Sequence, residues 1–412
     1  MSKNTQYDKN AGSGMFERHY VKTIVDRISE TNNPLMQVVV GPRQTGKSTM
    51  LGQALAKIDT EQFFISADDA IVPSEEWLQV EWQQARNATR SGSCPVVLVV
   101  DEIQKVPHWS LVVKSLYDAD RRNDTPVRVV LSGSSSLLLH KGLEDSLMGR
   151  FELIHSPHWS YSECSQAFGF SFDDYLYYGG YPGAARFASD DARWISYIRE
   201  AIIEPTISQD VLALEDIRKP ALMRALFRLG ATYSAQELSY TKMLGQLQDA
   251  GNTVTVAHYL DLLDKAGMLC GIQKYDARAV KRRKSSPRFM VYDTSLMTAS
   301  SGIEKSRYLG EPDLRGHLVE SAVGARLLAR ASEEGLGVYW WREGIKEVDF
   351  VVLKGFDSLS AIEVKSGKEK GQSGMADFLS ANPNAKRIVV GGAASGACGV
   401  EEFLKDEVEL FY

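Results

Sequence analysis

The segment with the clearest chemistry is glycine-rich and lies between an apolar run, Met36–Val40, and a stretch of helical character. It reads Gly41-Pro42-Arg43-Gln44-Thr45-Gly46-Lys47-Ser48-Thr49. This spacing fits the phosphate-loop motif G-x-x-x-x-G-K-[ST] in its usual strand-to-helix context, which makes a chance glycine-rich turn the weaker explanation. Loop N–H groups and a helix N-terminus bind phosphate oxygens. The motif predicts ATP as cofactor, with Lys47 at the β- and γ-phosphates and Ser48 on Mg²⁺.

Two further apolar runs end in polar residues suited to nucleotide hydrolysis. Val96–Val100 is followed by Asp101 and Glu102. Asp101 is expected to bind Mg²⁺, and Glu102 to polarise the attacking water. Val127–Leu131 is followed by Ser132, which would sit beside the γ-phosphate as a sensor. An ordinary serine-rich turn remains the alternative for Ser132.

Arg150 ends a short helical pattern just before an apolar run at 151–154. It fits an arginine finger that acts on the nucleotide of a neighbouring subunit. An arginine that interacts with the helix dipole is an equally good explanation.

The apolar runs alternate with helical patterns up to about residue 158. Such alternation predicts an α/β fold with a parallel sheet and helices on both faces. The boundaries expected from composition and pattern are a flexible tail at 1–14, a P-loop core at 15–158, a helical subdomain at 159–215, a third domain at 216–303 and a last one at 304–412.

These motifs together resemble the prokaryotic AAA+ ATPases with the pattern GPRQ-x-GK[ST], then DEIQ, then G-S-S and L-x-G-R segments. The matching residues here are Gly41–Ser48, Asp101–Gln104, Gly133–Ser135 and Leu147–Arg150. The resemblance implies an AAA+ fold, ATP binding and self-association into an oligomer, with a ring as the expected form. Residues 159–215 would be the helical lid, from which Arg186 would reach the nucleotide as a second sensor.

The third segment, 216–303, has three helical patterns followed by two strand-like runs around a basic loop. That order is the outline of a winged helix-turn-helix. The predicted DNA contacts are Lys281, Arg282, Arg283, Lys284 and Arg288. Cations at the tip of a wing neutralise phosphates and give salt-dependent affinity for DNA. A solvated basic loop without a partner is the alternative.

Carboxylates and a lysine gather in the last segment. Two apolar runs flank the turn Gly355-Phe356-Asp357, which predicts a β-hairpin. A hairpin that is symmetric about Phe356 places Asp349 opposite Glu363, with Lys365 on the same face. Like charges opposite one another require a cation, and oxygen ligands suit Mg²⁺ or Mn²⁺.

This arrangement resembles the PD-(D/E)xK nuclease core, in which D, a hairpin and E-x-K form the metal site. The resemblance implies a further glutamate from the preceding helix, and Glu320 fits that place. Catalysis by Glu320, Asp349, Glu363 and Lys365, with metal on Asp349 and Glu363, is one interpretation. A nuclease-like fold that only binds is the second. A plain Asp349–Lys365 salt bridge is the third.

Composition limits the remaining possibilities. The net charge of −6 makes a globally polybasic protein impossible, and the four cysteines lack metal-ligand spacing. The polar start without an apolar core and the lack of an 18-residue apolar run predict a cytoplasmic protein without membrane contact. Two functions stay open: an ATPase that acts on branched or ended DNA, with nuclease activity as an option, and a nucleotide-switched ATPase that binds a protein partner.

Overall fold

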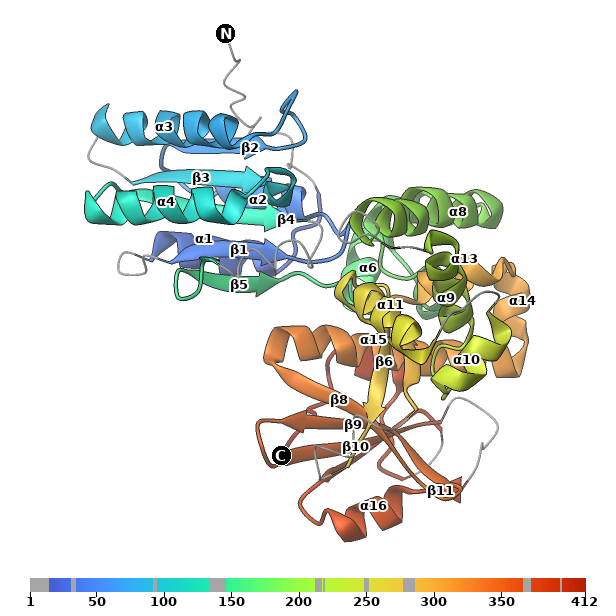
Figure 1. Ribbon diagram of the computed structural model, residues 1–412. Helices are drawn as coiled ribbons and strands as arrows, with labels where there is room; N and C mark the ends of the chain where they lie inside the picture. The colour runs from blue at the N-terminus through green and yellow to red at the C-terminus, as the bar shows by residue number, and fades with distance from the viewer. Residues whose placement is uncertain are drawn as a thin grey trace. The chain divides into compact units, whose positions relative to one another are not determined.

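The computed structural model describes residues 15–30, 35–91, 95–133, 146–211, 217, 219–247, 252–276, 286–365, 372–392 and 395–412. The chain divides into two compact units, Met1–Ser156 and Pro157–Tyr412, which are shown in Figure 1. None of the described helices combines the length and the apolar character that a membrane span needs. The predicted tail, 1–14, lies outside the described residues.

The first unit is built on a parallel five-stranded sheet of order β2-β3-β4-β1-β5. Its strands are β1 (Met36–Val40), β2 (Gln62–Ser66), β3 (Val96–Asp101), β4 (Val127–Gly133) and β5 (Phe151–His155). Every residue of β1 and β3 is buried, as continuous apolar runs in a doubly covered sheet should be. The β1 and β3 strands were predicted from these runs, whereas the half-buried β2 was not.

Helices cover both faces of this sheet, as predicted. The helices of this unit are α1 (Tyr20–Ser29), α2 (Lys47–Leu55), α3 (Glu75–Ser91), the 3₁₀ turn η1 (Ile103–Lys105) and α4 (Trp109–Arg122). One core joins α1 and α2 to Val39, Val97 and Val99. The other core joins α3 and α4 to Val38 and Leu98. Alternate residues of each strand therefore face different helix pairs.

The second unit begins with helices rich in aromatic residues. They are α6 (Tyr161–Phe168), α7 (Phe172–Tyr178), η2 (Pro182–Phe187), α8 (Asp191–Tyr197) and the π-helical turns η3 (Ile198–Ile203) and η4 (Thr206–Val211). The break at Gly179–Gly180 lets the chain pass close to Asp293, which accepts a hydrogen bond from the Gly180 N–H at 2.7 Å. A Cβ at Gly179 would lie 2.0 Å from Asp293 Oδ1, so glycine is required there.

Three helices and a hairpin follow: α9 (Pro220–Thr232), α10 (Tyr240–Gln246), α11 (Thr253–Lys265), β6 (Leu269–Lys274) and β7 (Arg288–Val291). The predicted order of three helices and two strands is present, and β6 and β7 pair antiparallel. The hairpin is not an isolated wing, because Gln273 and Lys274 of β6 also pair with Tyr339 and Trp340 of the next strand.

That shared strand makes the hairpin part of a seven-stranded sheet, ordered β12-β10-β9-β8-β6-β7 with β11 beside β9. The added strands are β8 (Leu336–Glu343), β9 (Lys346–Lys354), β10 (Ser358–Val364), β11 (Gln372–Ser373) and β12 (Lys386–Val390). The remaining helices are α13 (Thr294–Ser301), α14 (Lys305–Gly310), α15 (Pro312–Glu334), α16 (Met375–Ala381) and α17 (Val400–Leu404). All three segments expected to be separate beyond residue 158 lie within this one compact unit.

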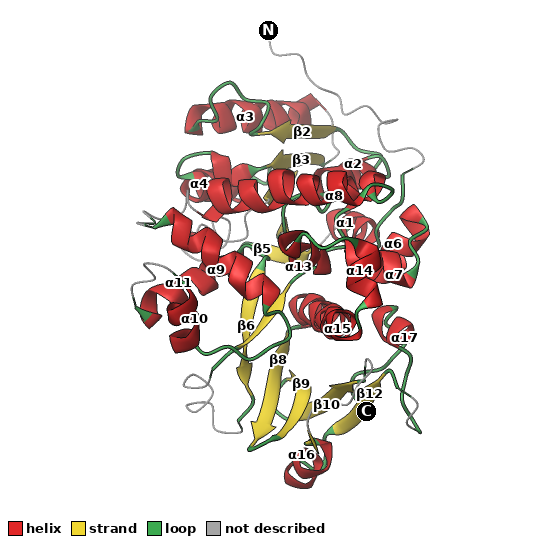
Figure 2. Cartoon of the chain, turned by 90° about the vertical axis from the view of Figure 1, so that its right-hand side faces the viewer, coloured by secondary structure: helices red, strands yellow, loops and turns green. Residues whose placement is uncertain are grey.

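Helices α15 and α16 pack on the sheet from opposite sides in Figure 2. Gly324 of α15 lies against β7 and β9, since a Cβ there would lie 2.4 Å from Met290 Sδ and 3.0 Å from Phe350. Phe378 of α16 packs with Val351 and Ala361. This close approach brings Glu320, one turn earlier on α15, toward the sheet.

Candidate functional site

The phosphate loop joins β1 to α2, and its conformation depends on glycine. A Cβ on Gly41 would lie 2.1 Å from the carbonyl oxygen of Ser156. Gly46 has φ +88°, in the left-handed region, and is the N-cap of α2. A Cβ on Gly46 would meet nothing within 4 Å, so the loop is open on that side. The nine-residue helix α2 therefore begins directly after the loop, and a helix N-terminus suits a phosphate group.

Lys47 lies folded over this loop. Its Nζ donates hydrogen bonds to the carbonyl oxygens of Gly41 at 3.0 Å and Pro42 at 2.6 Å. The Lys47 side chain is buried, so the ammonium is held at the loop and not in bulk water. Thr45 Oγ1 also donates to the Pro42 carbonyl, at 3.0 Å. The predicted phosphate-binding residues thus form one compact loop around a positive charge.

Asp101 joins the loop to the ends of two neighbouring strands. Its Oδ2 accepts a 2.6 Å hydrogen bond from Ser48 Oγ, and its Oδ1 accepts one from Ser132 Oγ. Asp101 and Ser132 are buried at the carboxyl ends of β3 and β4. The structure therefore brings together Ser48 and Asp101, the predicted Mg²⁺ ligands, with Ser132, the predicted sensor. Hydroxyl and carboxylate oxygens are ligands that Mg²⁺ prefers, so the residues present fit this cation.

Glu102 follows Asp101 in a strained conformation. Its φ is 53° and its ψ 37°, unusual for a residue other than glycine. Gln104 Nε2 donates a 2.6 Å hydrogen bond to Glu102 Oε2. Strain of this kind persists where the surrounding structure holds a side chain in a required place. The motif Asp101–Gln104 includes Gln104, but no role for this residue was predicted from the sequence. Its position two residues after Glu102 could have indicated that it contacts the Glu102 carboxylate.

Arg150 is held within its own unit. Its Nε and Nη2 donate to the two carboxylate oxygens of Asp118 on α4, at 2.8 and 3.0 Å. The hydrogen bond from Arg150 holds the pKa of Asp118 below its ordinary value. About a third of the Arg150 side chain is exposed. The planar bidentate pair fixes the guanidinium at the surface of the first unit.

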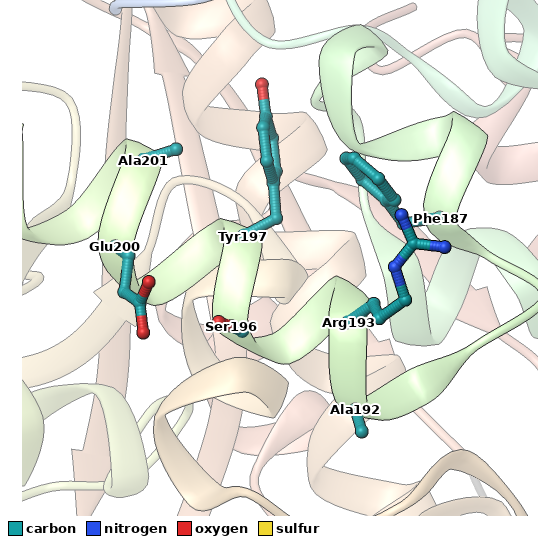
Figure 3. A pocket seen from close by; sticks show the side chains of 7 residues that line it. All are labelled: Phe187, Ala192, Arg193, Ser196, Tyr197, Glu200 and Ala201. Carbon is teal, nitrogen blue, oxygen red and sulfur yellow. The ribbon is translucent and has the colours of Figure 1, made fainter.

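Arg186 lies on η2 in the second unit, beside a depression of about 570 Å³. Figure 3 shows the lining residues, among which Arg193 and Phe187 face each other. The Arg193 guanidinium lies 5.2 Å from the centre of the Phe187 ring, and that of Arg186 lies 5.4 Å away. Arg186 Nε donates to the Gly183 carbonyl. These contacts fix the side chain locally and leave its role as a nucleotide sensor a prediction.

The predicted hairpin is confirmed in its register. Lys354 pairs with Ser358 and Phe350 with Ile362, so the turn centres on Phe356. The ladder ends one pair short of Asp349 and Glu363. Asp349 Oδ2 instead accepts a 2.8 Å hydrogen bond from the Val364 N–H. Glu363 pairs with Lys365 at 2.8 Å.

Arg288 is the residue that the sequence interpretation placed wrongly. It was predicted to contact DNA, but only 4% of it is exposed. Its guanidinium lies among Glu320, Glu347 and Asp349. Arg288 begins β7, where its side chain turns inward beneath α15, whereas a phosphate contact needs an exposed cation. The other predicted DNA contacts, Lys281–Lys284, lie outside the described residues.

The carboxylates of this cluster do not share a metal site. Over the described part of the chain, no group of three or more His, Cys, Asp or Glu side chains has an arrangement that could hold a metal ion. Burial raises the pKa of Asp349, with Glu347 and Glu363 adding to the rise and Arg288 opposing it. Asp349 and Glu320 contact Arg288, whereas Glu363 contacts Lys365. The predicted residues are neighbours, but protein cations balance their charges.

Comparisons with known families cover the chain in three pieces. Residues 33–165 match a family described as "AAA domain". Residues 169–307 match "Domain of unknown function (DUF8612)", and residues 315–397 match "Domain of unknown function (DUF4143)". The first match supports a P-loop ATPase of AAA type. The second spans both the expected lid and the expected winged helix.

Similar proteins are known in bacteria and archaea. An uncharacterized protein of Haemophilus influenzae is 22% identical over 87% of this chain and 89% of its own length. An uncharacterized protein of Mycobacterium tuberculosis is 29% identical over 74% of this chain. The aligned part covers 64% of the length of that relative. A third, from Methanocaldococcus jannaschii, is 23% identical over 87% of this chain and 81% of its own.

Solved structures of P-loop ATPases are similar to parts of the chain. The Walker-type ATPase of Pyrococcus abyssi is 14% identical and aligns with 70% of this chain and 96% of its own, with a TM-score of 0.47. The RuvB Holliday junction branch migration motor of Thermotoga maritima is 15% identical. It aligns with 62% of this chain and 89% of its own, with a TM-score of 0.32. Scores at this level carry no functional argument.

Proposed function

We propose that this protein binds and hydrolyses ATP at the phosphate loop of its first unit. The observation that carries the proposal is the hydrogen-bonded group of Ser48, Asp101 and Ser132 beside the loop. It joins the loop to the carboxyl ends of β3 and β4, where ligands of parallel α/β sheets bind. The match of residues 33–165 to an AAA domain supports the same activity.

The residues of the proposed nucleotide site have separate roles in binding and hydrolysis. Backbone N–H groups of the loop and of the α2 N-terminus bind phosphate oxygens, and Lys47 exchanges its carbonyl partners for the β- and γ-phosphates. Ser48 and Asp101 would hold Mg²⁺, which neutralises phosphate charge when bound. Glu102 accepts the proton of the attacking water, and Gln104 orients its carboxylate. Ser132 would turn its hydroxyl from Asp101 toward the γ-phosphate at the end of β4.

A lysine exchange tests this proposal. Lys47→Ala should abolish phosphate release from ATP and weaken ATP binding, because it removes the charge at the loop. Lys57→Ala is the matched control, since this half-exposed lysine pairs with Glu17 on the surface. Equal loss of turnover in both variants, or none in either, would overturn the assignment.

DNA is the partner we propose for the second unit. Three helices followed by an antiparallel pair support a winged-helix arrangement at α9–β7, and Lys281–Lys284 lie between the two strands in sequence. Cations at this place would bind phosphates without reading sequence. Salt-sensitive stimulation of ATP turnover by single strands, duplexes or four-way junctions is the expected result. A rate that no DNA changes would favour the alternative, a nucleotide-switched ATPase with a protein partner.

A further inference from the structure

A buried arginine lies in the carboxylate cluster where the nuclease-like interpretation expects a metal ion. Arg288 Nη1 is 3.0 Å from Glu320 Oε1 and 3.5 Å from Asp349 Oδ1, and it donates to the Asp349 carbonyl at 3.2 Å. Its Nη2 is 3.6 Å from Glu347 Oε2. The three carboxylates come from α15 and β9, and the arginine comes from β7. One guanidinium thus lies between elements that converge on the predicted site.

The charge of Arg288 is permanent, because a guanidinium does not lose its proton in a protein. The side chain also lies 5.4 Å from the centre of the Trp340 ring, a cation–π contact that holds it in the sheet. Among the described atoms, Arg288 Nε has no hydrogen-bond partner. The arginine is therefore held chiefly by the carboxylates at its Nη end. Removing the Arg288 charge would leave the negative charges of the carboxylates close together in a buried site.

Lys365 and Arg342 complete the balance of charge. Lys365 Nζ lies 2.8 Å from Glu363 Oε1, and Arg342 Nη2 lies 3.6 Å from Glu347 Oε2. The carboxylates that a divalent cation would need are therefore already paired with cationic side chains of the protein. A Mg²⁺ ion keeps strict octahedral geometry and would have to displace the Arg288 guanidinium first. The residues present do not fit a divalent metal.

We propose that Arg288 is the built-in counter-ion of this site and excludes divalent metal from Glu320, Glu347 and Asp349, so that the second unit does not cleave phosphodiesters by a metal-dependent route. The same arrangement predicts a latent metal site, which opens when the arginine charge is removed. This inference is independent of ATP hydrolysis, since every residue in it belongs to the second unit.

Mn²⁺ binding without nucleotide tests the proposal on the full chain. Wild-type protein and Asp349→Asn should bind Mn²⁺ equally, because any residual binding belongs to the P-loop unit in both. Arg288→Gln should gain one Mn²⁺ site, at least about tenfold tighter than the residual binding. Arg288→Gln combined with Asp349→Asn should lose that site. Arg288→Lys is the matched control, because it keeps a cation and should gain no site.

If Arg288→Gln does not fold, measurements on the wild-type protein and Asp349→Asn still test the proposal. Metal-dependent cleavage of plasmid DNA by the wild type that disappears in Asp349→Asn would overturn it. So would a wild-type Mn²⁺ site that this substitution removes. A folded Arg288→Gln variant without a new Mn²⁺ site would contradict the latent site. No cleavage, and unchanged Mn²⁺ binding in Asp349→Asn, is the result expected.

Discussion

At the scale of single residues, the side chains of the nucleotide site hold one another in place. Asp101 accepts from two hydroxyls that come from different elements, α2 and β4. Glu102 adopts a left-handed conformation at the end of β3, and Gln104 binds its carboxylate. Charge-assisted hydrogen bonds are stronger than neutral ones, so each acid has a defined orientation before a nucleotide arrives.

Gln104 should matter for turnover and not for binding. Gln104→Leu removes the donor that orients Glu102, so we expect kcat to fall about tenfold, a part of what general-base catalysis contributes. The affinity for ATP should stay unchanged in a fluorescent-nucleotide titration. Gln83→Leu on the surface of α3 is the matched control, since its exposed amide donates to Asn87 within the same helix. A kcat equal to that of the control would remove Gln104 from this role.

Asp349 should give the second unit a distinct pH dependence. Burial raises its folded-state pKa above the unfolded value of about 3.9. The folded state therefore holds the proton more strongly, and stability should fall as pH rises from about 3.9 through the raised pKa. Asp349→Asn should flatten this part of the profile when urea unfolding is followed from about pH 3.9 upward. Asp357→Asn, at the exposed hairpin turn, should not; equal profiles for both would contradict the prediction.

At the scale of elements, the sequence predicted the strands and turns that depend on local residue pattern. Apolar runs predicted β1 and β3. Glycine at 355 and the flanking runs predicted the hairpin register. The pairing of β6 with β8 was missed, because it joins residues more than 60 positions apart and leaves no periodicity in either segment.

The same limit explains the error at Arg288. Within a basic stretch it has the same residue type as its neighbours in the sequence, and only the tertiary fold turns it inward toward carboxylates on α15 and β9. Asp118 was not predicted as the partner of Arg150 for a similar reason, since it lies 32 residues away on α4. Sequence pattern therefore predicted the members of each site more completely than their pairing.

The basic loop should carry the affinity for DNA. Changing Lys281, Arg282, Arg283 and Lys284 to Ser should weaken binding to all DNA sequences and flatten the plot of log affinity against log salt by about one unit per lost contact. A matched control changes Lys22, Lys57, Arg121 and Arg122, four exposed cations of the first unit, to Ser. Equal slopes in the two variants would show that the loop makes no phosphate contact.

At the scale of the whole molecule, the proposed functions belong to two different compact units. The first carries the nucleotide residues and Arg150, and the second carries the proposed DNA surface and the carboxylate cluster. If Arg150 acts on a neighbouring subunit, it must leave Asp118, the partner it has within its own chain. Self-association would then supply the energy for that exchange through new contacts with nucleotide phosphates.

Mixing two inactive variants tests this assembly. Arg150→Ala lacks the finger and Glu102→Gln lacks the base, so each alone should turn over ATP slowly. Mixed subunits form some interfaces with both groups intact, and we expect ATP turnover well above the mean of the separate variants. Sedimentation with ATP should show an oligomer at micromolar protein. A monomer under these conditions, or strictly additive rates, would contradict a role in trans.

Single-turnover kinetics of Glu102→Gln test most directly whether ATP is hydrolysed at Asp101–Glu102. With enzyme in excess over ATP, this variant should bind ATP as tightly as the wild type, because the loop, Lys47, Ser48 and Asp101 are intact. Phosphate formation should slow by about 10²-fold or more, because the base is lost. Phosphate formation at the wild-type rate by the Glu102→Gln variant would contradict the account.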